Sequence, residues 1–233
     1  MPSRPDLAGL GYGVLAVIDT ALAGAGPTSK RLRRLTKPLL MPVLMAAFTA
    51  ATPGRQDALR RGTLAAEAFS WAGDVALLGS SRRAFLAGVG SFAAAHVAYS
   101  AGFVAARKRG SDVAGPGTAA AVASWLVLTP VVATAAGKRD PALRIPVAGY
   151  ATLLCTMFAA STRLDPSFPA EVRRRIVLGT SLFLVSDTVL AVNKFLRSDP
   201  DARLDAFVMA TYTAGQWLIA DGVAHTAGPQ SAV

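Results

Sequence analysis

Charged residues are scarce in this chain. Only 16% of its 233 residues are Asp, Glu, Lys or Arg, whereas soluble domains average about 25%. Hydrophobic residues make up 52% of the sequence, and the mean hydropathy is +0.41. This shortage of charge argues against a water-soluble globular domain and favours a protein whose surface faces lipid.

Cysteine and histidine are also nearly missing. The single cysteine, Cys155, excludes an internal disulfide and a cysteine-rich metal site. A metal site built from His96 and two carboxylates would be a weak signal, so we expect neither a metal nor another cofactor. The sequence also lacks a P-loop, a glycine-rich dinucleotide fingerprint and a nucleophile elbow.

The charges that are present gather in short clusters. Lys and Arg concentrate in stretches such as 30–37, 107–110 and 173–175, with nearly neutral segments between them. This layout is typical of a polytopic membrane protein, in which charge is confined to the connections. The net charge is +10, but the basic residues flank apolar runs. We therefore expect anionic membrane lipids, and not nucleic acid, as partners.

Long apolar segments fill the rest of the chain. A helix needs roughly 20 mostly apolar residues to cross a bilayer, and the short connections here carry Pro, Gly and basic residues, which end helices. We predict an all-α bundle that forms a single integral membrane domain over residues 1–233, a multi-pass protein of the cell membrane. The eight predicted spans are residues 7–26, 36–52, 62–79, 84–106, 118–136, 143–161, 175–196 and 204–224.

The first span has an alternative interpretation as a signal peptide. Arg4 precedes it, and ALAGA (21–25) offers small residues for cleavage. Asp19 interrupts the apolar stretch and favours a retained span. The sequence predicts no orientation, because Lys and Arg are divided eleven against twelve between the connections on the two sides.

Ionisable residues inside the spans are the main functional signal. Such a group costs roughly a few kcal/mol in hydrocarbon, so it turns toward the bundle interior and often marks a working site. We expect Glu67 near the membrane surface, and Asp19 and Asp221 at the interface because they are near helix ends. The ionisable residues are Asp19, Glu67, Asp74, His96, Asp187, Lys194 and Asp221, and their polar companions are Tyr99, Tyr212 and Gln216.

Spacing groups most of these residues. Residues three, four or seven apart share one face of a helix. The pairs with such spacing are Glu67 and Asp74, Asp187 and Lys194, His96 and Tyr99, and Tyr212 and Gln216. The structural alternative is interhelical hydrogen bonding, which stabilises membrane bundles modestly. For Lys194 a further alternative is that its ammonium extends to the lipid head groups.

A short pattern recurs around two aspartates. GDVAL (73–77) and SDTVL (186–190) each contain a small residue, Asp, two further residues and Leu. The two aspartates lie similarly far into the third and seventh spans, which enter the membrane from the same side. We therefore expect the two carboxylates at one depth, converging on a common cavity. The recurrence of this pattern is also compatible with an internal repeat of two four-helix halves (4+4).

Longer stretches resemble the YhhN-like family of multi-pass membrane proteins, nearly from end to end. The elements GD-x-x-L, AH-x-x-Y, SD-x-x-L and Y-x-x-x-Q together carry the resemblance. The matching stretches are TKPLLMP (36–42), FSWAGDVALL (69–78), FLAGVGSFAAAHVAYSAGF (85–103), the GY…M…AAS run (149–161), LGTSLFLVSDTVLAVNKF (178–195) and VMATYTAGQWLIADG (208–222).

The resemblance implies an activity as well as a fold. It implies an eight-helix membrane hydrolase acting on lysoplasmalogen, a lysophospholipid with a vinyl-ether chain. The partners are then this lipid and water, and the products are a fatty aldehyde and a glycerophospho-base, glycerophosphocholine or glycerophosphoethanolamine. It also implies that Asp74 and Asp187 are the catalytic pair.

Vinyl-ether hydrolysis suits two carboxylates in one cavity. Protonation of the β carbon gives an oxocarbenium ion that water attacks, so the chemistry needs one protonated acid and one anion. Glycosidases use a pair of carboxyl groups in a reaction that passes through a related oxocarbenium-like transition state. Asp74 and Asp187 are expected to share these roles. The other expected site residues are His96 and Tyr99 for water or proton transfer, Tyr212 and Gln216 for the glycerol or head group, Lys194 and Lys37 for the phosphate, and Glu67 in support.

Two alternatives remain at this point. One is a hydrolase of another lysolipid or ether lipid, and the other is a non-enzymatic transporter or lipid-binding protein, because buried acids also serve proton coupling. Transporters often interrupt helices with Gly or Pro near the midplane. Apart from Pro130 and Pro146, the prolines here lie in connections or near predicted helix ends, which favours the enzyme.

Overall fold

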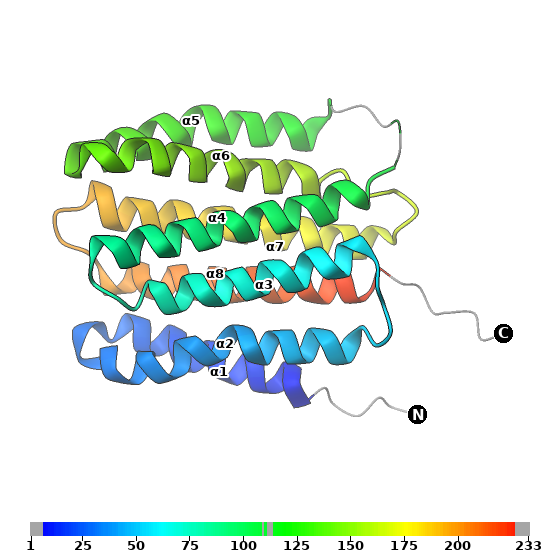
Figure 1. Cartoon of the computed structure of the whole chain (residues 1–233), viewed down its shortest axis with the longest axis horizontal. Coiled ribbons are helices and arrows are strands. Elements are labelled where there is room, and N and C mark those ends of the chain that lie inside the picture. The colour runs from blue at the N-terminus through cyan, green and yellow to red at the C-terminus, as the bar shows by residue number, and fades with distance from the viewer. Residues whose placement is uncertain (1–6, 109, 111–113, 227–233) are drawn as a thin grey trace.

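The computed structural model describes residues 7–108, 110 and 114–226, and all regular secondary structure in these residues is helical. The α-helices lie side by side along one common direction (Figure 1). They are α1 (Leu7–Gly24), α2 (Lys30–Ala51), α3 (Ala58–Ala76), α4 (Arg82–Ala105), α5 (Pro116–Arg139), α6 (Arg144–Ser161), α7 (Ala170–Ala191) and α8 (Ala202–Ala224).

The prediction of an all-helical bundle is confirmed, and each predicted segment coincides with one helix. The largest difference is in α2, which begins at Lys30 instead of residue 36. Lys, Arg and Leu are good helix formers, so the basic cluster continues the helix out of the apolar segment. Pro38 and Pro42 consequently lie inside α2, where near-terminal positions were expected.

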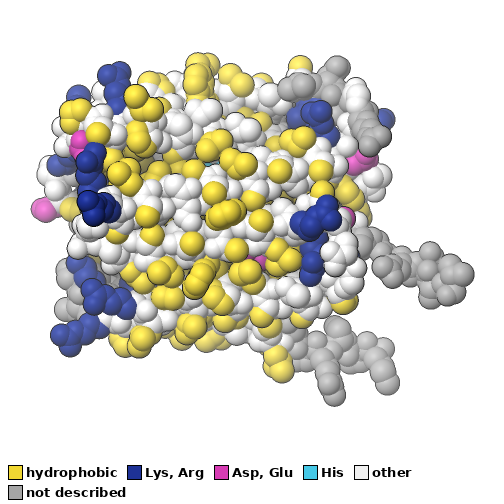
Figure 2. All heavy atoms as spheres, in the orientation of Figure 1, with side chains coloured by type: hydrophobic (Ala, Val, Ile, Leu, Met, Phe, Trp, Pro, Cys, Tyr) yellow, Lys and Arg dark blue, Asp and Glu magenta, His cyan; other side chains and the backbone are white. Residues whose placement is uncertain are grey.

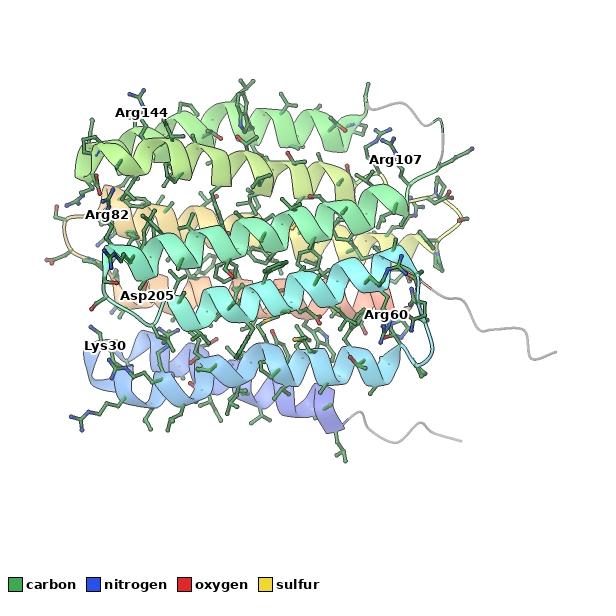
Figure 3. The ribbon with its side chains drawn as sticks, viewed as in Figure 1. Lys30, Arg60, Arg82, Arg107, Arg144 and Asp205 are labelled. Atoms are coloured by element: carbon green, nitrogen blue, oxygen red, sulfur yellow. The ribbon has the colours of Figure 1, made fainter. Side chains whose placement is uncertain are left out.

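Charge and apolar surface are separated along the bundle. Lys and Arg gather at both ends, and the band between them carries mostly hydrophobic and uncharged side chains (Figure 2). Lys30 and Arg82 lie at one end, and Arg60 and Arg107 at the other (Figure 3). We refer to these as the Lys30 end and the Arg60 end. Side chains of this distribution fit a bundle whose middle contacts hydrocarbon.

In the part of the chain that the structure describes, five helical segments are long and apolar enough to cross a membrane. The remaining helices, α2, α3 and α8, are interrupted by more charged or polar residues, such as Glu67 and Asp74 in α3. The chain therefore has the character of a membrane protein. The five segments are Leu7–Gly24, Arg82–Ala105, Pro116–Arg139, Pro141–Ser161 and Ala170–Leu196.

Glycines bring two pairs of helices into close contact. A Cβ atom added to Gly179 would lie 2.7 Å from the carbonyl oxygen of Gly215, so the backbones of α7 and α8 touch there. A Cβ added to Gly62 would lie 2.8 Å from the Ala98 oxygen, which brings α3 against α4 in the same way. Small residues permit such contacts in membranes, where packing replaces the hydrophobic effect. These two tight pairs carry the motif aspartates.

An aromatic cluster fills the space between the two pairs. Phe92 of α4, Phe183 of α7 and Tyr212 of α8 meet edge to face, with ring centroids 5.4–6.3 Å apart. The His96 ring joins them, 5.0 Å from Phe183. Edge-to-face contacts add to the stability that burial provides and fix ring orientation. These ring contacts therefore restrain Tyr212 and His96 independently of their polar contacts.

Candidate functional site

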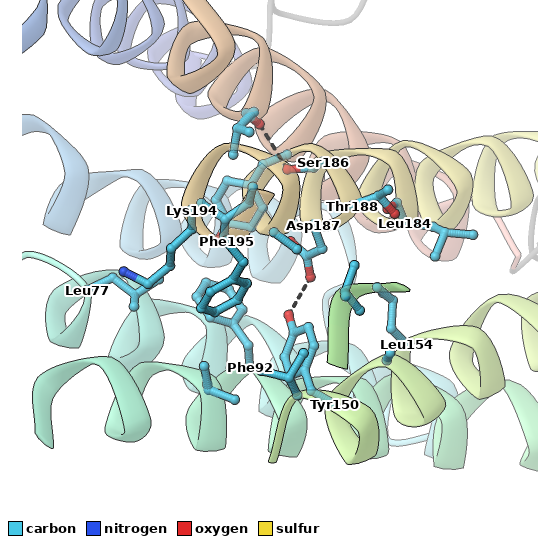
Figure 4. A pocket seen from close by; sticks show the side chains of 18 of the residues that line it. Leu77, Phe92, Tyr150, Leu154, Leu184, Ser186, Asp187, Thr188, Lys194 and Phe195 are labelled. Atoms are coloured by element: carbon cyan, nitrogen blue, oxygen red, sulfur yellow. Dashed lines mark hydrogen bonds between the residues drawn. The ribbon is translucent and has the colours of Figure 1, made fainter. Parts of the chain in front are cut away.

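A cavity of about 280 Å³ lies between the helices in the half of the bundle nearer the Lys30 end. Asp74 and Asp187 both line it, so we call it the carboxylate cavity. Apolar side chains, including Phe92 and Leu154, make up much of its remaining wall (Figure 4). The cavity thus combines two acidic groups with a surface that suits a hydrocarbon chain.

Asp74 is buried, and both of its carboxylate oxygens have partners. Lys37 Nζ lies 3.2 Å from Oδ1, and the Asp74 side chain is 1% exposed. The Tyr212 hydroxyl donates to Oδ2 at 2.7 Å. A buried charge without partners costs several kcal/mol, and these contacts from α2 and α8 favour the charged carboxylate. Asp74 therefore joins three helices at the cavity wall.

The α2 backbone explains how Lys37 is positioned. Pro42 has no N–H, so the carbonyl of Pro38 lacks its usual helical partner. The Trp71 indole N–H of α3 donates to that carbonyl oxygen at 3.0 Å. Lys37 directly precedes Pro38, and Trp71 lies one turn before Asp74. The Pro38 carbonyl, which Pro42 leaves free, thus accepts a hydrogen bond that fixes α2 against α3 beside the Lys37–Asp74 ion pair.

Asp187 has a different set of partners. The Tyr150 hydroxyl of α6 donates to its Oδ2 (Figure 4). His96 Nε2 of α4 lies 3.0 Å from the same hydroxyl and 3.7 Å from Oδ2. Within the described part of the chain, no Lys or Arg pairs with Asp187, and its Oδ1 accepts no hydrogen bond. The side chain is 11% exposed and lines the cavity.

The contacts of the two aspartates follow one plan. Asp74 of α3 is held from α2 and α8, and Asp187 of α7 is held from α6 and α4. Exchanging the first four helices with the last four converts one set into the other. Lys37 and Tyr150 also correspond, since each lies 37 residues before its aspartate (74 − 37 and 187 − 150). The two sets differ in charge, because Lys37 is a cation and Tyr150 is neutral.

The end of α7 brings Lys194 to the cavity. Here the helix continues as one π-helical turn, Val192–Leu196, a distortion that frequently occurs at functional sites. Lys194 Nζ lies 4.4 Å from the centroid of the Phe85 ring, a cation–π contact. Lys194 lines the carboxylate cavity (Figure 4) and is itself an exposed residue, so its ammonium is accessible both to a ligand in the cavity and to lipid head groups.

Glu67, Tyr99 and Gln216 do not line the carboxylate cavity. Tyr99 donates to Gln216 Oε1 at 2.5 Å, and Gln216 Nε2 donates to Ser70 Oγ at 3.0 Å. Glu67, which was expected near the membrane surface, has a side chain that is fully buried inside the bundle. It lies in the middle of α3, which begins at Ala58 and so extends further than predicted. Neither Glu67 oxygen has a hydrogen-bond partner in the described residues.

His96 also lies behind the cavity wall, and it acts on the cavity only through its neighbours. It is fully buried and does not line the cavity. Its Nε2 meets Tyr150, whereas Nδ1 has no partner in the part of the chain that is described. Tyr99, three residues later, is bonded to Gln216 instead. The spacing of His96 and Tyr99 therefore does not bring them to one site.

Two acids near helix ends have different surroundings. Asp19 was expected at the interface, but it is fully buried, with Arg33 Nη2 at 3.1 Å and the Thr36 hydroxyl at 2.6 Å. Both partners come from α2, which a position along α1 cannot reveal. Asp221 is 21% exposed and pairs with Arg175 at 2.6 Å, as expected for a residue at the bundle's edge.

Sequence reasoning missed several polar residues of the cavity wall. Tyr150, Arg33 and Asp205 line the cavity together with the thiol of Cys155, which is 5% exposed. The available signal for Tyr150 was a hydroxyl in an otherwise apolar segment. Asp205 is fixed by the Asn193 amide, which donates to it at 2.8 Å. In residues 7–108, 110 and 114–226, no three His, Cys, Asp or Glu side chains are grouped to hold a metal ion.

Comparison with known proteins gives one match. The model of the YhhN family matches residues 32–223, which is most of the chain and includes every residue of the carboxylate cavity named above. No curated protein and no solved structure matches the chain.

Proposed function

The chain belongs to the YhhN family, and from this premise we propose that it is a membrane-embedded hydrolase of lysoplasmalogen. It would cleave the vinyl-ether bond to give a fatty aldehyde and a glycerophospho-base. The observation that carries the proposal is the convergence of Asp74 and Asp187, from different helices, on one largely apolar cavity. Two carboxyls in such surroundings can hold different protonation states.

The cavity suits an amphiphile with a single chain. Its apolar wall would accept the hydrocarbon, and its basic residues would accept a phosphate near the Lys30 end. Lys194 is the best suited of these, because Phe85 and not a carboxylate contacts its ammonium. Lys37 and Arg33 also line the cavity, each paired with an aspartate.

The reaction balances with the protein's own acids and water. A carboxyl proton is transferred to the β carbon, whose double-bond electrons form the new C–H bond, and the α carbon becomes part of an oxocarbenium ion. Water forms a C–O bond at the α carbon and returns one proton to the carboxylate. The hemiacetal then loses its hydroxyl proton, the ether C–O bond breaks, and the glycerol oxygen is protonated.

The proposal includes the arrangement in the membrane. All eight helices would cross the bilayer of the cell membrane, including α3 and α8, whose mid-helix polar residues Glu67, Asp74 and Gln216 are buried, and α2. We also infer a 4+4 repeat from the corresponding positions of Lys37 and Tyr150. Aligned family sequences cut between α4 and α5 would test it, because their halves should align with Asp74 opposite Asp187.

The direct test is aldehyde release by purified, detergent-solubilised protein given a vinyl-ether lysophospholipid. We expect release by the wild type and a loss of about 100-fold or more in Asp187→Asn, a typical contribution of a general acid. Asp221→Asn is the matched control, since Asp221 lies outside the cavity, and it should retain activity. Release only from acyl or alkyl lysolipids would assign another lipid substrate, and no hydrolysis of any of them would favour lipid binding or transport.

A further inference from the structure

The two cavity aspartates are unequally equipped for proton transfer. Both oxygens of Asp74 are occupied, one by the Lys37 ammonium at 3.2 Å and one by the Tyr212 hydroxyl at 2.7 Å. Asp187 uses Oδ2 for Tyr150 and has Oδ1 without a protein partner in the described residues. Oδ1 of Asp187 could therefore carry a proton without breaking a protein contact, whereas Asp74 would have to break one.

Charge leads to the same distinction. An ammonium beside a carboxylate favours its ionised form, and Asp74 has Lys37 as such a neighbour. The partners of Asp187 in the described residues are Tyr150 and His96, and no Lys or Arg pairs with it. Of the two cavity aspartates, Asp74 is therefore the one held in an ion pair with a lysine.

Lys37 in turn depends on Asp74. An ammonium has three N–H groups, of which Asp74 engages one. Lys37 is 12% exposed and lines the cavity, so its other N–H groups can face a ligand. The Trp71 bond to the Pro38 carbonyl holds the backbone beside it.

We propose that the two aspartates have separate roles: Asp187 is the catalytic acid, and Asp74 is a positioning residue that holds the Lys37 ammonium toward the phosphoglycerol part of the substrate. The assignment rests on the proposed function. It predicts that Asp187 governs the rate of the chemical step, whereas Asp74 and Lys37 act as one unit in substrate binding.

The kinetic test compares kcat and KM for aldehyde release by Asp187→Asn, Asp74→Asn, Lys37→Met and the Asp74→Asn/Lys37→Met double variant. Asp187→Asn should lower kcat by more than about 100-fold with little change in KM. Asp74→Asn and Lys37→Met should each raise KM about tenfold, and the double variant should be no worse than either, because the pair acts as a unit. Equal loss of kcat in both Asp→Asn variants, or additive effects of Asp74→Asn and Lys37→Met, would overturn the assignment.

An infrared measurement decides the same point without catalysis. A Glu67→Gln background removes the buried carboxyl that has no hydrogen-bond partner in the described residues. In that background, the C=O stretch of a protonated carboxyl should disappear with Asp187→Asn and persist with Asp74→Asn. The reverse pattern would overturn the assignment even in well-folded protein. If the wild type releases no aldehyde, the proposed substrate is wrong, and the infrared result alone still decides which aspartate holds the proton.

Discussion

Asp74 and Glu67 lie two helical turns apart on one face of α3 and are almost equally buried, at 1% and 0% exposed. Their surroundings differ completely. Asp74 has an ammonium, a tyrosine hydroxyl and a cavity beside it, whereas Glu67 has no hydrogen-bond partner in the described residues and does not line the carboxylate cavity. Burial in an apolar helix therefore does not by itself identify a working carboxyl. The partners supplied by neighbouring helices distinguish the two.

Among substitutions that leave both cavity aspartates in place, the largest effect should come from removing the Tyr150 hydroxyl, the partner of Asp187. Tyr150→Phe deletes the hydroxyl that donates to Asp187 and contacts His96. Asp187 becomes a carboxylate as it gives up its proton, and loss of a hydrogen bond to a charged group costs about 1.5–3 kcal/mol, so we expect kcat to fall by about 10- to 100-fold. Tyr212→Phe is the comparison, and it should mainly affect KM. Unchanged kcat in Tyr150→Phe would show that Asp187 does not depend on this partner.

Replacing Lys194 tests whether its ammonium, which contacts Phe85 and no carboxylate in the described residues, binds the phosphate of the lysophospholipid. Lys194→Met retains much of the chain volume over Phe85 but removes the charge. A charge-assisted hydrogen bond to a phosphate is worth about 1.5–3 kcal/mol, so KM for the lysophospholipid should rise by at least about tenfold while kcat is kept. An equal KM for wild type and variant would argue against a phosphate at the π-helical turn.

Trp71 offers a smaller effect, on stability. Trp71→Phe removes the N–H that bonds the free carbonyl of Pro38 and keeps an aromatic ring. Removing one hydrogen bond between membrane helices costs about 0.6 kcal/mol of stability on average, so the Tm in detergent should fall by a few degrees. A simultaneous rise in KM would indicate that the bond also positions Lys37. No shift in Tm would mean that water or lipid replaces the indole.

The smallest effect is expected at Glu67. Because neither carboxyl oxygen has a partner in the described residues, Glu67→Gln removes no contact and avoids any cost of ionisation. We expect kcat and KM within about twofold of wild type and an unfolding free energy that is equal or slightly higher. Asp74→Asn, measured beside it, should show the larger change. A severe loss of activity in Glu67→Gln would remove the distinction between the two carboxyls.

The sequence was sufficient for the helices and for the two aspartates, for physical reasons. Apolar runs separated by Pro, Gly and basic residues determine where membrane helices lie, and a carboxyl inside such a run is unusual enough to be noticed. The similar depth of Asp74 and Asp187 depends on helix length and direction, both of which follow from the segments themselves. Both aspartates do line one cavity.

The partners could not be predicted in the same way, because they depend on which helices become neighbours. Tyr150 meets Asp187 only because α6 lies beside α7, and Arg33 reaches Asp19 only because α2 folds back along α1. Spacing along one helix also gave misleading pairs. His96 and Tyr99 share a face of α4 but turn to different helices, α6 and α8. Local periodicity gives the direction of a side chain and not the group that it meets.

Cys155 gives the cavity a chemical reporter. It is the only thiol in the chain, and it lies in the wall shared by Asp74 and Asp187. We therefore expect an alkylating reagent to reach this thiol through the space in which the lipid is proposed to bind. The rate of thiol loss measures how often that space is open and vacant, and a saturating lipid should slow it whether or not the lipid is hydrolysed.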